Sequence, residues 1–154
     1  MATQRLLLLP FLLLVGGCFK QDKNQTSQIL PLAYPTGYSP VRFCRPIQGP
    51  IQGHTSGYII VRATSDVGAL YNAATGPLPQ GSLLVAEEYD KADCTSLTGY
   101  TLMFKDAFTD PPTAEAWHWQ RLDDQRDVVQ DGRVQSCINC HTLCNRNDYT
   151  CSPP

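Results

Sequence analysis

Four stretches in the middle of the chain have the composition or the alternation of β-strands. They are Tyr58–Thr64, Ser82–Tyr89, Gly99–Lys105 and Trp117–Leu122. In the third stretch, GYTLMFK, the side chains of Tyr100, Leu102 and Phe104 fall on one face, which predicts a half-buried strand. In the fourth, WHWQRL, the two tryptophans share a face and His118 lies on the other. The pattern therefore predicts a sheet.

The remaining segments predict loops and short helices. Pro31–Gly57 is rich in Pro and Gly, which predicts loops with short extended pieces. Asp66–Tyr71 predicts a single helical turn, Asp123–Gly132 a polar loop or hairpin, and Val134–His141 a short helix. The expected fold class is mainly antiparallel β with a few short helices (α+β), in one domain over residues 31–154.

The N-terminus has the pattern of an export signal. Arg5 precedes an apolar run, Leu6–Val15, which is too short to span a bilayer. The residues Val15-Gly16-Gly17 before Cys18 resemble the bacterial lipobox, in which a peptidase cuts before a lipidated cysteine. We expect residues 1–17 to be removed as a lipoprotein signal peptide and Cys18 to carry lipid. The alternative is an ordinary signal peptide followed by an incidental cysteine.

Export fixes the expected surroundings of the domain. Residues 20–28 are polar, and residues 18–30 are expected to form a flexible tether from the bacterial cell envelope to a domain that faces the periplasm. Phe19 is not the aspartate associated with inner-membrane retention, which favours the outer membrane. The formal net charge of −2 provides no basic surface for nucleic acid. The compartment is oxidising, so disulfides are expected.

The densest chemistry lies in Cys137-Ile138-Asn139-Cys140-His141, the Cys-x-x-Cys-His attachment motif of c-type haem. Two thiols about one helical turn apart can add to the two haem vinyl groups, and the adjacent histidine can then bind the iron as proximal ligand. Zinc is an alternative, with Cys137, Cys140, His141 and either Cys144 or Cys151 as ligands. A redox-active Cys pair and two structural disulfides are further alternatives.

The cysteine count is consistent with one covalently bound haem. The chain has seven cysteines. If Cys18 carries lipid and two cysteines carry haem, four remain, and four allow three pairings. We favour Cys44–Cys94, which would tie the N-terminal segment to the sheet, and Cys144–Cys151, which would close a short loop beside the haem motif.

The order of segments resembles the cytochrome P-460 and cytochrome c′-beta family. The resemblance rests on YPTGY (34–38), LPQGSLLVAEEY (78–89), GYTLMFKD (99–106), WHWQRL (117–122), GRVQSCINCH (132–141) and the following Asp148-Tyr149. Together these segments cover about residues 33–150. The haem motif is the most specific of them, and their order is the stronger argument.

The resemblance implies an antiparallel β fold, a homodimer, and one haem c with His141 as the sole protein ligand of the iron. It implies an open distal position that binds nitric oxide or carbon monoxide, or supports redox chemistry on small nitrogen species. In the P-460 branch, a lysine cross-linked to the haem accompanies hydroxylamine oxidation. Ala86 occupies that place here, and Lys105 belongs to a different strand, so hydroxylamine oxidation is not expected.

Candidates for the distal side are His118, Met103, Glu87 and Glu88. Each has a structural alternative: His118 on the outer face of a strand, Met103 in the core, and at least one of the glutamates exposed. His54 is expected to be solvent-exposed in a Gly-rich loop. The aromatic residues expected in the core or as walls of the haem site are Tyr100, Phe104, Trp117 and Trp119.

Two other functions compete with ligand binding at an open iron. One is a six-coordinate electron-transfer cytochrome in which Met103 or His118 binds the iron. The other is a zinc- or disulfide-stabilised lipoprotein without catalysis, suggested by the additional Cys144 and Cys151 beside the motif.

Overall fold

Six strands form one antiparallel sheet in which each strand pairs with its neighbours in sequence, in the order β1-β2-β3-β4-β5-β6. The computed structural model describes residues 27–47, 54, 56–107 and 112–151. The strands are β1 (Ser39–Pro46), β2 (Tyr58–Ala63), β3 (Leu83–Tyr89), β4 (Leu97–Lys105), β5 (Trp117–Asp123) and β6 (Val128–Gly132). The expected fold class, antiparallel β with a few short helices, is confirmed.

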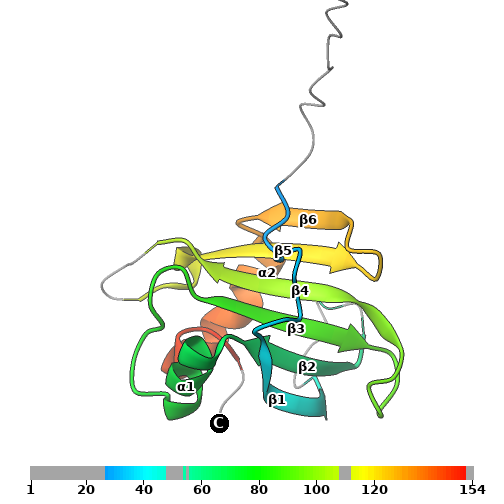
Figure 1. Cartoon of the computed structure of the whole chain (residues 1–154). Coiled ribbons are helices and arrows are strands. Elements are labelled where there is room, and N and C mark those ends of the chain that lie inside the picture. The colour runs from blue at the N-terminus through cyan, green and yellow to red at the C-terminus, as the bar shows by residue number, and fades with distance from the viewer. Residues whose placement is uncertain (1–26, 48–53, 55, 108–111, 152–154) are drawn as a thin grey trace, which may run out of the picture.

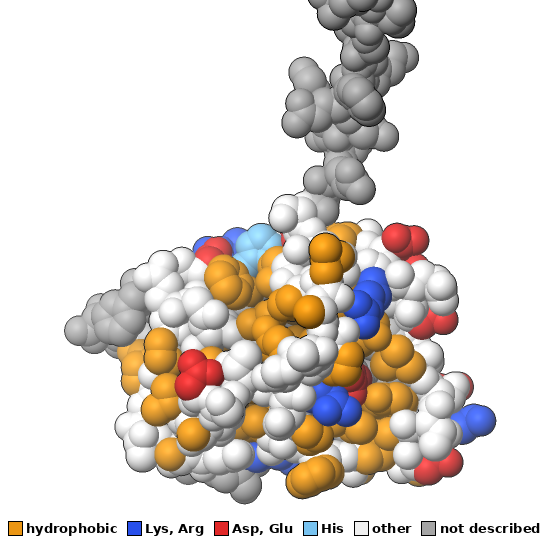
Figure 2. Space-filling model, in the orientation of Figure 1, with side chains coloured by type: hydrophobic (Ala, Val, Ile, Leu, Met, Phe, Trp, Pro, Cys, Tyr) orange, Lys and Arg blue, Asp and Glu red, His pale blue; other side chains and the backbone are white. Residues whose placement is uncertain are grey.

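Short helices lie against one face of this sheet and an extended segment crosses the other (Figure 1). The α-helices are α1 (Ser65–Ala73) and α2 (Gln135–His141), and the 3-10 helices are η1 (Ala114–Ala116) and η2 (Thr142–Asn147). The N-terminal segment (residues 27–38) crosses the face opposite α2 (Figure 1). Hydrophobic side chains on that face are divided by polar and charged groups (Figure 2).

The period-2 alternation of the strands divides the interior into two clusters, one on each face of the sheet. Met103 packs with the helices, whereas Leu102, the next residue back, packs with the N-terminal segment. The prediction that Gly99–Lys105 is half-buried was wrong, because Leu102 and Lys105 are 0% and 1% exposed. Alternation predicts which residues share a face, but it does not show that a distant segment covers the second face.

The sequence predicted that the domain begins at residue 31, but residues before it already pack against the sheet. Gln120 accepts a hydrogen bond from the backbone amide of Ile29 at 2.7 Å and donates one to the carbonyl of Ser27 at 2.9 Å. Leu30 is 2% exposed. The proposed signal peptide and Cys18 lie outside the described residues. None of the described helices is long and apolar enough to cross a membrane.

One disulfide lies at the sheet and one in the C-terminal segment, and both predicted pairings are confirmed. Cys44 on β1 bonds to Cys94 in the turn between β3 and β4, across a sequence separation of 50. Cys144 bonds to Cys151, seven residues away, after α2. The first bond holds the edge strand, and the second closes the C-terminal loop.

Two elements are longer than the sequence pattern predicted. Residues 39–46 form a complete strand, although two prolines and two register shifts interrupt its pairing with β2. Proline is tolerated there because β1 is an edge strand of the sheet. The helical turn expected at Asp66–Tyr71 is a helix of nine residues. Of the two structures expected for Asp123–Gly132, the hairpin is confirmed, since β6 pairs with β5.

Candidate functional site

A cavity of about 320 Å³ lies between the C-terminal segment and the face of the sheet that carries the helices. This volume falls within the range of about 300–1,000 Å³ that is common for cofactor and ligand pockets. The C-terminal wall includes Cys140, His141, Leu143 and Thr150; the sheet wall includes Ile59, Val61, Leu84, Ala86, Thr101, Met103 and Trp119. Most of the sheet wall is apolar, so a cofactor here would be shielded from water.

His141, the last residue of α2, lines this cavity in a form suited to binding a metal. Its Nδ1 lies 2.5 Å from the carbonyl oxygen of Tyr149. A carbonyl only accepts, so Nδ1 carries the hydrogen and Nε2 keeps the lone pair. Burial lowers the pKa of His141 to about 4, so the ring is neutral at pH 7. The ring packs edge-on against Trp119 with centroids 4.4 Å apart.

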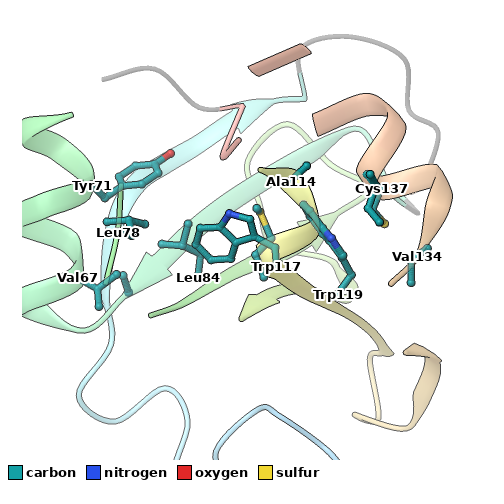
Figure 3. Packing of buried hydrophobic residues seen from close by; sticks show 12 residues of the cluster. Val67, Tyr71, Leu78, Leu84, Ala114, Trp117, Trp119, Val134 and Cys137 are labelled. Carbon is teal, nitrogen blue, oxygen red and sulfur yellow. The ribbon is translucent and has the colours of Figure 1, made fainter. Parts of the chain in front are cut away.

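The two cysteines of the motif remain as thiols while the other four described cysteines form disulfides. They stand three residues apart on α2, which places them on one side of the helix. Cys140 lines the cavity. Cys137 is buried beside Trp119 and Val134 (Figure 3), and burial raises the pKa of its thiol. Neither thiol is used in a disulfide, and His141 follows directly.

A buried ion pair holds the loop that orients His141. Lys105 Nζ lies 2.6 Å from Asp148 Oδ2, and their side chains are 1% and 2% exposed. The same carboxylate oxygen accepts the amide hydrogen of Leu78 at 2.9 Å, and the indole of Trp117 donates to the Asp148 carbonyl at 3.1 Å. The sequence reasoning assigned Lys105 only to a strand and missed this contact.

Asp148 and the residue that follows it have an unusual backbone. Asp148 and Tyr149 have φ angles of 48° and 65°, in the left-handed region that side chains other than glycine rarely adopt. The hydroxyl of Tyr149 donates to the carbonyl of Pro112 at 2.8 Å. The ion pair, this hydrogen bond and the Cys144–Cys151 disulfide together hold the Tyr149 carbonyl against His141. The proximal histidine is therefore fixed from behind.

The sheet wall includes Ala86, the residue that the resemblance would place where the cross-linking lysine stands. Ala86, in the middle of β3, lines the cavity, so the position faces the expected site but lacks an amine. Lys105 cannot replace it, because its amine is bound to Asp148. Among the described residues, no lysine lines the cavity.

Two distal candidates lie on the wrong face of the sheet. His118 was wrong as a distal candidate: it bonds through Nε2 to Asp131 at 2.9 Å and is 28% exposed, as its structural alternative predicted. Glu87 also faces away from the cavity, where it accepts hydrogen bonds from Tyr34 at 2.6 Å and Arg62 at 2.8 Å. Alternation along β5 and β3 explains both positions.

The other two candidates are on the cavity side. Met103 lines the cavity and also packs in the core cluster, so both of its interpretations agree with the structure. Glu88 is 1% exposed and accepts a hydrogen bond from Thr101, a cavity residue. The expectation that at least one glutamate is exposed was wrong, since Glu87 is 7% exposed.

The structure also corrects the expectation for His54. It lines the cavity, its side chain is only 19% exposed, and its Nδ1 lies 2.8 Å from Glu88 Oε1. A loop residue cannot be placed by periodicity, so the sequence pattern provided no signal for this contact.

The aromatic residues divide between the two faces of the sheet. Trp119 lines the cavity, and Trp117 packs in the same cluster beside Lys105. Tyr100 and Phe104 belong to the opposite face, so the interpretation of these two as walls of the site was wrong.

The set of donors fits a covalently bound haem better than zinc. The disulfide between Cys144 and Cys151 removes the fourth ligand that a zinc site would need. Among the described residues, no group of three or more His, Cys, Asp or Glu side chains is arranged to hold a metal ion. Two thiols, one neutral imidazole and apolar walls are instead the groups that haem attachment requires.

Comparison with known proteins agrees with this geometry. The family model for Cytochrome P460 matches residues 52–152, most of the chain. A comparison with curated proteins finds no match. The matched region extends from the residues before β2 to the end of the C-terminal loop, including both thiols and His141. Membership of this family implies a haem cofactor, and the cavity has the donors to hold one. The chain belongs to the cytochrome P460 family.

Proposed function

We propose that the protein binds one haem c through thioether bonds at Cys137 and Cys140, with His141 Nε2 as the proximal iron ligand. The observation that carries this proposal is the neutral, buried His141, whose Nδ1 is held by the Tyr149 carbonyl beside two unpaired thiols. A histidine that donates its other ring N–H to a fixed acceptor is the common form of a metal ligand.

The haem would supply an iron to which nitric oxide or carbon monoxide binds, or which exchanges electrons with small nitrogen species. The residues of the cavity set the conditions for this chemistry. Leu84, Val61 and Met103 limit access of water from the sheet side. The Tyr149 carbonyl fixes the tautomer of His141 and makes its Nε2 a more basic ligand for a metal.

Hydroxylamine oxidation by a cross-linked haem is not part of the proposal. Ala86 lines the cavity where the resemblance would place the lysine, and Lys105 is paired with Asp148. Neither residue can supply an amine to the cofactor.

Covalent attachment is tested by expressing the full chain in a host with the haem-attachment machinery. Peroxidase staining of a denaturing gel should show haem on the wild-type protein and none on the Cys137→Ala, Cys140→Ala double variant. The matched control is Cys44→Ala, Cys94→Ala, which also removes two cysteines but should retain haem. Full covalent haem on the first double variant would refute the assignment.

A second candidate function is electron transfer by a six-coordinate iron. It is favoured by Met103, a soft thioether on the cavity wall. Spectra of the oxidised and reduced protein, before and after carbon monoxide, separate the two functions. A carrier should stay low-spin and resist carbon monoxide, whereas a ligand-binding protein should take it up.

The proposal also includes a location: removal of residues 1–17, lipid on Cys18, and a domain that faces the periplasm from the outer membrane. The motif Val15-Gly16-Gly17-Cys18 supports it. Cells grown with labelled palmitate should incorporate the label into the wild-type protein, and the Cys18→Ala variant should not. Label on that variant would contradict lipidation at this residue.

A further inference from the structure

His54 is the second histidine of the cavity. It reaches the cavity from the segment before β2, whereas His141 reaches it from α2. Both rings line the same cavity, so a group bound there can meet a histidine from each side. His118, the third histidine, is on the opposite face of the sheet and serves as an internal comparison.

The two cavity histidines are held in the same way. His141 Nδ1 bonds to a carbonyl, and His54 Nδ1 lies 2.8 Å from the carboxylate of Glu88. A carboxylate accepts, so Nδ1 of His54 carries a hydrogen, and in the neutral ring Nε2 has the lone pair. This carboxylate–histidine arrangement is the usual support of a metal-binding imidazole.

The support of His54 is itself fixed. Glu88 is 1% exposed, and its Oε1 accepts hydrogen bonds from both Thr101 and His54. The hydroxyl of Thr98 donates to the backbone carbonyl of Glu88 at 3.1 Å. A buried carboxylate with these partners has one position, so the orientation of the His54 ring is defined by the sheet rather than by its own loop.

We propose that His54 Nε2 binds the haem iron opposite His141 when no external ligand is present. The inference rests on the proposed function, since it requires a haem on Cys137 and Cys140. Without an external ligand, His54 would occupy the coordination position that the family resemblance implies is open. An external ligand such as carbon monoxide then binds only after the bond between iron and His54 breaks, so its apparent affinity is reduced by the fraction of protein in which His54 is bound.

The experiment compares absorption and electron paramagnetic resonance spectra of the haem-loaded wild type, His54→Ala and His118→Ala. The wild type and His118→Ala should be six-coordinate and low-spin. His54→Ala should be high-spin, should return to low-spin when imidazole is added, and should bind carbon monoxide at least about tenfold more tightly when reduced. Restoration by imidazole separates a lost ligand from a damaged fold.

Other results would overturn the inference. A high-spin wild type, or a His54→Ala protein that stays low-spin, removes His54 from the iron. If Met103→Leu alone becomes high-spin, the sixth ligand is Met103.

Glu88→Gln keeps an acceptor for Nδ1 of His54 without the charge. This variant should stay low-spin with a higher reduction potential, because a less basic imidazole stabilises oxidised iron less. Absence of covalent haem from the wild type would instead refute the proposed function.

Discussion

Lys105 and Asp148 show how a single contact between distant residues can control a cofactor ligand. Their charges are almost fully buried, and the pair joins β4 to the loop whose Tyr149 carbonyl holds His141. A buried pair adds little net stability, but removing one partner leaves an uncompensated charge. The role of this pair is therefore to fix one arrangement of the loop.

Lys105→Met should lower the free energy of unfolding by about 3–5 kcal/mol, because the Asp148 carboxylate loses its counter-charge. Urea unfolding followed by tryptophan fluorescence measures this change. The absorption spectrum of the bound haem should also change, since the acceptor of His141 becomes mobile. The control is Lys91→Met, which removes an exposed lysine and should change neither quantity. A loss below about 1 kcal/mol would mean that water replaces the lysine.

At the scale of elements, the sequence predicted the strands that carry their own pattern. The four stretches with β-branched or alternating residues became β2, β3, β4 and β5 within a few residues. β1 was described only as short extended pieces, because its prolines and bulges hide its period. The prediction of a short helix at the haem motif is confirmed, since two cysteines three residues apart come to one side of a helix.

What the sequence could not predict depends on contacts between distant segments. The burial of both faces of β4 requires the N-terminal segment, and the position of His54 requires Glu88 on β3. The pairing of Lys105 with Asp148 joins residues 43 positions apart. No local pattern encodes such contacts, so the distal side of the site was the least predictable part.

Gly99 is a glycine on which the pairing of β4 with β5 depends. A Cβ at this position would lie 2.5 Å from the backbone carbonyl oxygen of Leu122, so one strand would have to move. Gly99→Ala should therefore lower the free energy of unfolding by about 1–3 kcal/mol. Gly57→Ala is the matched control, since an added Cβ there meets nothing within 4 Å. Equal urea midpoints of unfolding for both variants would contradict the prediction that a Cβ at residue 99 displaces a strand.

For the whole molecule, the two disulfides should differ in what they stabilise. In the chain-entropy model, a loop of 50 residues is worth about 4 kcal/mol and a loop of seven about 2 kcal/mol. Replacing Cys44 and Cys94 by alanine should thus cost more stability, as measured by urea unfolding. Replacing Cys144 and Cys151 should cost less stability but should change the haem spectrum more, because this bond closes the loop behind His141. The opposite order in either measurement would contradict the assigned roles.

We also propose a homodimer, which would form through β1, one of the two edge strands of the sheet. Phe43 on β1 is 77% exposed, and β1 is at the edge of the sheet. Light scattering of the haem-loaded domain should give twice the monomer mass, and Phe43→Glu should shift the protein towards the monomer. Val129→Glu, at an exposed apolar residue on β6, is the control that should leave the mass unchanged. A monomeric wild type would remove the dimer from the proposal.

The disulfide between Cys144 and Cys151 also has a consequence for how the protein is made. Four cysteines lie close together in one segment, and the structure has one pair oxidised while Cys137 and Cys140 are reduced. An oxidising compartment would join any two of them, and a wrong pair would consume a thiol that the haem needs. If the domain matures in the periplasm as proposed, closure of the Cys144–Cys151 bond before haem attachment would remove these two competitors. Maturation of this segment would then depend on the order in which its cysteines react.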